Sequence, residues 1–165
     1  MLFRSHTTGP SLVVTAVDPN EKHGPDAYGE RQWVGVDQDL PFVIYFENLP
    51  DATAPAQQVV ITDALSPNLD WRTFQLGEIA VGDLVIELPP RQAHYSNDVE
   101  LSDNLIMRVE AGLNVQTGVV TWTLTAIDPA TGQIPQDPLI GLLPPNDPQL
   151  HDGEGHVAFR IRARN

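Results

Sequence analysis

The stretch VVTWTLTAI at residues 119–127 places an apolar side chain at every second position. In an extended chain Val120, Trp122, Leu124 and Ala126 share one side, opposite a row of threonines. A period of two is typical of a half-buried β-strand, because successive side chains of a strand point to opposite faces. This stretch therefore predicts an antiparallel sheet with one buried face and one face in water.

The same alternation recurs on both sides of this stretch. It covers residues 11–17, 40–47, 57–63, 84–88, 105–110 and 156–164. No long window carries the apolar stripe of an amphipathic helix. The 15 prolines and 12 glycines punctuate the chain as turn residues do. The pattern predicts an all-β fold of about eight antiparallel strands, a sandwich or a barrel.

The chain length fits one domain over residues 1–165. Its first strand is expected at residues 11–17. Residues 18–39 are polar and residues 128–155 are rich in proline, so we expect two long ordered loops there. Loops of this length are uncommon unless a ligand, a metal or their own packing orders them.

The composition excludes several function classes. The net charge of −13 disfavours binding to nucleic acid and to anionic lipid. The absence of cysteine excludes disulfides, thiolate metal sites and cysteine nucleophiles. No apolar stretch is long enough for a membrane helix, and residues 1–10 carry no apolar signal segment. The chain is either cytosolic or a fragment of a longer secreted protein, and we expect the fragment.

Residues 39–83 read DLPFVIYFENLPDATAPAQQVVITDALSPNLDWRTFQLGEIAVGD. They resemble the Ig-like "conserved repeat" modules of large bacterial and archaeal secreted or surface proteins. In those modules a strand ending in Asn is followed by a strand running into Thr-Asp and Leu, and then by Leu-Asp, Gly and Gly-Asp. The stretch DPNEK at residues 18–22 resembles the Asp-Pro-Asn-Asp-Lys that often precedes them.

This resemblance implies an Ig-like β-sandwich that serves as a spacer, stalk or adhesion scaffold outside the cell, with no catalytic residues. Its partners would be neighbouring modules of the same parent chain or other surface proteins. Such modules continue past the strand that matches residues 156–164, whereas this sequence ends at Asn165. Either residues 1–17 supply the last strand or a sheet edge stays open. An open edge would favour edge-strand self-association.

A first candidate metal site lies in the predicted 18–39 loop. Asp18 and Asn20, with Asp37 or Asp39, could supply the hard oxygen ligands that Ca²⁺ prefers. The alternative is a structural turn in which Asp18 accepts hydrogen bonds from backbone amides and Lys22 pairs with a carboxylate. Lys22 is the single lysine of the chain. It is therefore also the one side-chain amine that could form an amide cross-link, for which a polar loop is an unsuitable place.

A second candidate site is the run NDPQLHDGEGH near the end of the chain. Calcium would take the oxygens of Asp147, Asp152 and Glu154, whereas a transition metal would take His151 and His156 with a carboxylate. The alternative is a solvated loop that leads into the last strand.

Aromatic residues raise the question of sugar binding. Trp33, with Tyr28 nearby, could form a platform for polysaccharide, whereas Trp122 is expected in the core and Trp71 at a sheet end. No Gly-x-Ser-x-Gly motif is present. The leading expectation is a non-catalytic structural or adhesive module in which Ca²⁺ orders the loops. The alternatives are a carbohydrate- or protein-binding module that uses the long loops and, further behind, a hydrolase with a carboxylate site.

Overall fold

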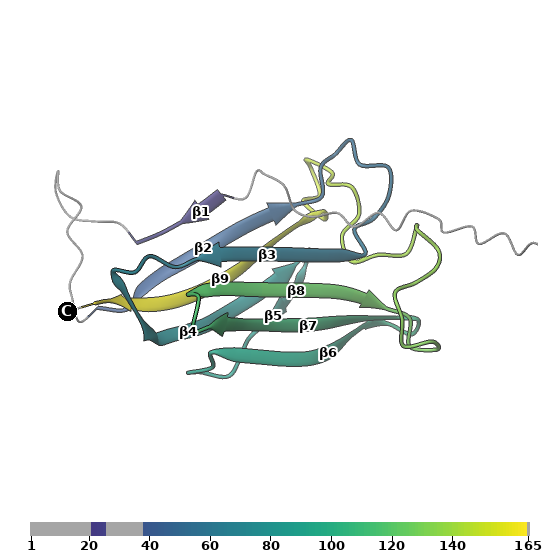
Figure 1. Cartoon of the computed structure of the whole chain (residues 1–165). Helices are drawn as coiled ribbons and strands as arrows, with labels where there is room; N and C mark the ends of the chain where they lie inside the picture. The colour runs from purple at the N-terminus through teal and green to yellow at the C-terminus, as the bar shows by residue number, and fades with distance from the viewer. Residues whose placement is uncertain (1–20, 26–37, 165) are drawn as a thin grey trace, which may run out of the picture.

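The computed structural model describes residues 21–25 and 38–164. These residues form an all-β sandwich of two antiparallel sheets, one of five strands and one of four, without a helix. The predicted fold class is thus confirmed (Figure 1). The predicted strand at residues 11–17 lies outside the described residues. No described segment is a helix that could span a membrane.

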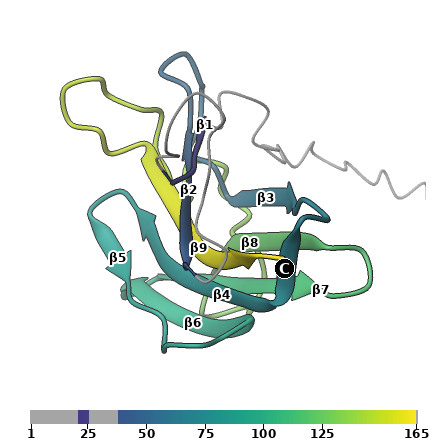
Figure 2. The same cartoon turned by 90° about the vertical axis from the view of Figure 1, so that its left-hand side faces the viewer.

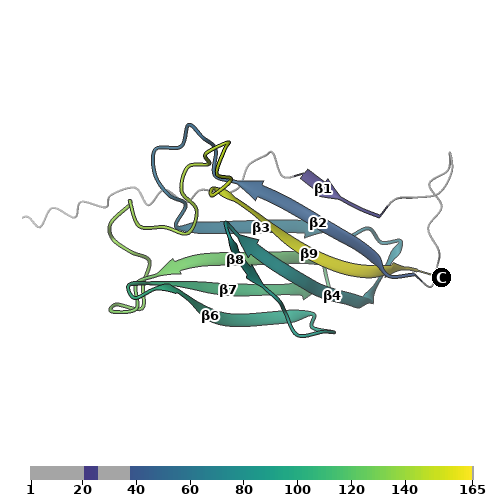
Figure 3. The same cartoon turned by 180° about the vertical axis from the view of Figure 1, so that it is seen from behind.

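The larger sheet has the strand order β1-β2-β9-β4-β5. Its strands are β1 (Glu21–His23), β2 (Leu40–Glu47), β9 (Glu154–Ala163), β4 (Leu69–Val81) and β5 (Leu84–Ile86). The smaller sheet has the order β3-β8-β7-β6. Its strands are β3 (Gln58–Ala64), β8 (Val119–Ile127), β7 (Leu105–Asn114) and β6 (His94–Ser102). Strand β9 lies between β2 and β4, as Figure 3 shows from behind.

The two predicted loops need correction at their limits. The 18–39 prediction is wrong over Glu21–His23, which form β1 on the edge of β2. Three exposed polar residues carry no alternation, so their pairing is set by tertiary contacts. The 128–155 loop ends one residue before Glu154, where β9 begins. Backbone bridges from Ala56 to Leu143 and from Asp128 to Gln133 order this loop.

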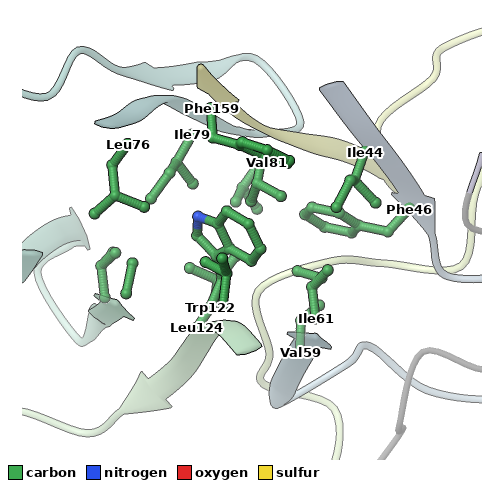
Figure 4. Close-up of a cluster of buried hydrophobic side chains, with 14 of the residues drawn as sticks. Ile44, Phe46, Val59, Ile61, Leu76, Ile79, Val81, Trp122, Leu124 and Phe159 are labelled. Atoms are coloured by element: carbon green, nitrogen blue, oxygen red, sulfur yellow. The ribbon is translucent and has the colours of Figure 1, made fainter. Parts of the chain in front are cut away.

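The core fills the space between the two sheets. Trp122 of β8 is 0% exposed and lies 5.9 Å from Phe159 of β9, measured between ring centroids. Figure 4 shows Ile44 and Phe46 of the larger sheet facing Val59 and Ile61 of the smaller one, with Trp122 beside them. Burial of these apolar side chains is the main favourable term in folding.

The expectation that residues 1–17 supply a last strand falls outside the described residues. Strand β9 is hydrogen-bonded on both sides, so it is not at an edge. In the described part of the chain, β3 pairs with β8 on one side and with no strand on the other. Edge-strand self-association stays a prediction.

Candidate functional site

Two glutamates face each other at the end of the sandwich where β2 finishes and β9 starts. Glu47 and Glu154 are direct cross-strand partners, a position at which like charges repel. The side-chain Nδ2 of Asn146 donates one hydrogen bond to Glu47 Oε2 and another to Glu154 Oε1, both of 2.9 Å. Asn146 is buried. A single buried amide thus holds the two carboxylates together.

The loop around Asn146 is fixed by backbone hydrogen bonds. Asn146 N donates to Asn48 O, and Asn48 N donates to Gly153 O, both at 2.8 Å. The buried Asn48 side chain donates to the carbonyls of Ala54 and Leu143. A Cβ on Gly153 would collide with the backbone of Asn146, so this close approach requires glycine.

His151 contacts the same carboxylate from the solvent side. Its Nδ1 lies 2.8 Å from Glu154 Oε1. The hydrogen bond with Glu154, and then its charge, raise the pKa of His151, while the hydrogen bonds from His151 and then Asn146 lower the pKa of Glu154. His151 has φ 56°, a left-handed conformation that turns the loop back toward β9.

A hollow of about 300 Å³ lies beside the two glutamates. It is lined by Glu21, Tyr45, Phe46, Glu47, Glu154 and Gly155. The exposed ring of Tyr45 contacts His23 edge-on and His156 at a tilt. Three of the lining residues are glutamates and two are aromatic, a combination that suits a small polar or cationic group. In the described part of the chain, no three His, Asp or Glu side chains gather closely enough to hold a metal ion.

The three predicted calcium ligands of this loop have separate partners. Asp147 Oδ1 accepts a hydrogen bond from Gln149 N at 2.8 Å, and Asp152 Oδ1 accepts one from Asp147 N at 3.2 Å. Glu154 is bound to Asn146 and His151. These carboxylates stabilise turns of the loop. Calcium binding stays a prediction.

The predicted 18–39 site is only partly described. Asp39 lies at the opposite end of β2, where its Oδ1 accepts a 2.6 Å hydrogen bond from Arg162 Nε. This hydrogen bond lowers the pKa of Asp39. The structure therefore separates Asp39 from the 146–154 loop. The other candidates lie outside the described residues; they are Asp18, Asn20, Asp37, Tyr28 and Trp33.

Two side chains that organise this end of the molecule were not predicted, Glu47 and Gln57, and Asn146 lay in the predicted run without a role of its own. Gln57 Nε2 lies 2.9 to 3.0 Å from the carbonyls of Pro135, Asp137 and Ile140, which anchors the proline-rich loop. Their partners are distant in sequence, so no local pattern marks them. The loops they join expose four large apolar side chains: Leu49, Ile134, Leu139 and Leu150.

The fold defines an antiparallel β-sandwich that is compatible with an Ig-like module. Residues 18–102, just over half of the chain, match DUF7619, which is described as a domain of unknown function. The chain belongs to this family. No curated protein and no solved structure matches it.

Proposed function

We propose that this domain is a non-catalytic structural or adhesive module, a spacer or stalk, of a secreted or cell-surface bacterial protein. The observation that carries the proposal is the placement of Glu21 and Arg164 at opposite ends of the larger sheet. Glu21 pairs with Tyr45, near the start of β9, whereas Arg164 follows the other end of β9 (Figure 1). Ten residues of β-strand span about 30 Å between these ends.

This arrangement suits a module that transmits tension. Strands β1, β2 and β9 form antiparallel ladders between the two ends. The hydrogen bonds of such ladders are perpendicular to the strands, so a pull along the strands loads many bonds together. A spacer in a surface protein needs this resistance.

The chemistry of the described side chains also supports a structural role. Asn146, Asp147, Asp152 and Glu154 of the 146–154 loop all have hydrogen-bond partners within the domain, and the interior is filled by apolar residues. The resemblance of residues 39–83 to surface modules supports a location outside the cell and neighbouring modules as partners. The net charge of −13 favours solubility and disfavours nucleic acid. Ca²⁺ would add stability by ordering the loops.

A second candidate function is a binding module for protein or polysaccharide. The apolar side chains exposed at one end of the sandwich favour it, since Leu139 and Leu150 are 68% and 69% exposed on loops that the structure holds in place. Leu139→Ser with Leu150→Ser should then abolish cell adhesion. Val115→Ser is the matched control, because Val115 is 65% exposed on the turn at the opposite end.

A domain replacement in the parent protein distinguishes the two functions. Antibodies against the domain should label intact cells, and external protease should remove the label. Deletion of the domain should impair the parent protein, and an unrelated sandwich of equal length should restore it. Restoration supports a spacer; failure to restore, with the surface label intact, supports a binding module. An epitope found only after lysis contradicts both.

A further inference from the structure

Lys22 reaches from one layer of the sandwich to the other. It is the middle residue of β1 in the larger sheet, and its Nζ lies 2.6 Å from Oδ2 of Asp63 in β3 of the smaller sheet. Figure 2 shows β1 and β3, the outer strands of their sheets, on the same side of the sandwich. The predicted pairing of Lys22 with a carboxylate is confirmed. The expectation that Lys22 lies in a polar loop is wrong, because Lys22 lies in β1.

The surroundings of this contact are partly apolar. Lys22 Nζ lies 4.9 Å from the ring centroid of Phe42 and 5.4 Å from that of Phe159. The Asp63 side chain is 14% exposed and that of Lys22 is 37% exposed. The two rings keep water from one side of the contact. The 2.6 Å between Lys22 Nζ and Asp63 Oδ2 is a direct hydrogen bond, so the two groups are in contact.

We propose that Lys22 and Asp63 condense into an amide that joins β1 covalently to β3. Transfer of one proton from Nζ to the carboxylate gives a neutral amine and a carboxylic acid. The Nζ lone pair then attacks Cγ of Asp63, a second Nζ proton moves to the departing hydroxyl, and one water leaves. The balance is one amine and one acid consumed, one amide and one water formed, with no change in oxidation state.

The fold holds the amine and the carboxyl group in contact, whereas in solution they would have to meet by diffusion. Two groups held in contact react as if at a very high concentration, because the entropy of bringing them together has already been lost on folding. The chain contains no other lysine to compete. The product closes a loop between positions 41 residues apart, which restricts the unfolded chain. The inference goes beyond the proposed function and does not depend on it.

The test is the intact mass of the full chain after incubation at neutral pH. The wild type should be lighter than its calculated mass by one water. Asp63→Asn should lose one ammonia in the same reaction and so reach the same final mass as the wild type. Lys22→Arg keeps a cation but has no nucleophilic amine, so it should stay at its calculated mass, as should Asp63→Ala. Proteolysis should yield one branched peptide that contains both positions.

Two results would overturn the proposal. One is a wild-type chain that is folded by circular dichroism and remains at its calculated mass. The other is a loss of water that persists in Lys22→Arg, because the dehydration then lies elsewhere, for example in a succinimide at an aspartate. The first of these results needs only the mass of the wild-type chain, so it can be read even if a variant fails to fold.

Discussion

Trp71 of β4 lies against Gly118 so closely that a Cβ on Gly118 would overlap the indole ring. Gly118 ends the turn between β7 and β8 with φ +71°, a conformation that L side chains rarely adopt. Trp71 Nε1 donates a 3.1 Å hydrogen bond to Ser66 O, which fixes the ring over the glycine. One contact thus joins the larger sheet to a turn of the smaller sheet.

Gly118→Ala should destabilise the domain by about 3 kcal/mol, because it adds a collision with Trp71 to the backbone strain of a positive φ. Gly132 is the matched control, since it has φ +68° and open space where a Cβ would lie. Gly132→Ala should cost about 1 kcal/mol from strain alone. Urea denaturation measures both. Equal losses would mean that Trp71 does not lie over Gly118.

Asn146→Asp should destabilise the domain by about 3 kcal/mol at neutral pH, because it replaces a shared donor with a third carboxylate. Adding Glu47→Gln should restore part of the loss, since one carboxylate is removed and an amide donor returns. Thermal unfolding of the two single variants and the double variant measures the coupling. Strictly additive changes would show that the three side chains do not interact.

The His151–Glu154 pair should stabilise the domain only within a window of pH. The raised pKa of His151 means that its contribution is present below its ordinary value of 6.5 and disappears as the pH rises through the folded value. The lowered pKa of Glu154 means that its contribution is present above 4.5 and disappears as the pH falls through the folded value. His151→Ala should therefore lower the melting temperature most between these limits, at about pH 5.5.

The matched comparison for this pair is His94, an exposed histidine of β6 whose ring lies against Gly112 rather than beside a carboxylate. His94→Ala should change the melting temperature far less than His151→Ala at about pH 5.5. A loss in His151→Ala that stays equal at about pH 8 would contradict the ion pair.

The strands with unbroken alternation could be predicted from the sequence. Strands β2 and β8 have the predicted bounds, residues 40–47 and 119–127. Strand β4 was not predicted, because register shifts between Asp70 and Gln75 and between Leu76 and Ile79 break its period of two. Strand β6 is a largely exposed edge strand, so it carries few apolar residues to mark its inner face.

The candidate site was less predictable, because its contacts join residues far apart in the chain. The sequence marks the 146–154 run as acidic and rich in histidine, but it does not show that Glu47 is the partner of Asn146, 99 residues away. Asp147 and Asp152 could equally be metal ligands or turn caps, since the same oxygens serve both. Lys22 and Asp63 are 41 residues apart, and the pairing of β1 with β2 brings them together, which no local pattern in the sequence indicates.

The Lys22–Asp63 contact should be the first to resist tension on the domain. Strand β1 is only three residues long, so its backbone ladder with β2 is short. The Lys22–Asp63 contact therefore supplies much of the attachment of β1 to the rest of the domain. Lys22→Met should remove this contact and leave β2, β9 and the core unchanged. In this variant β1 should detach first. The force then acts on Leu40 and Arg164, which lie at the same end of the β2–β9 ladder, so it breaks the hydrogen bonds of that ladder one after another.

Single-molecule pulling on the two ends of the chain tests the spacer function most directly. We expect one cooperative rupture, at a clearly higher force in the wild type than in Lys22→Met, because the ladders between Glu21 and Arg164 break together in shear. The same force in both proteins would contradict the role of the Lys22–Asp63 contact. Gradual extension of the wild type at low force would contradict the spacer function.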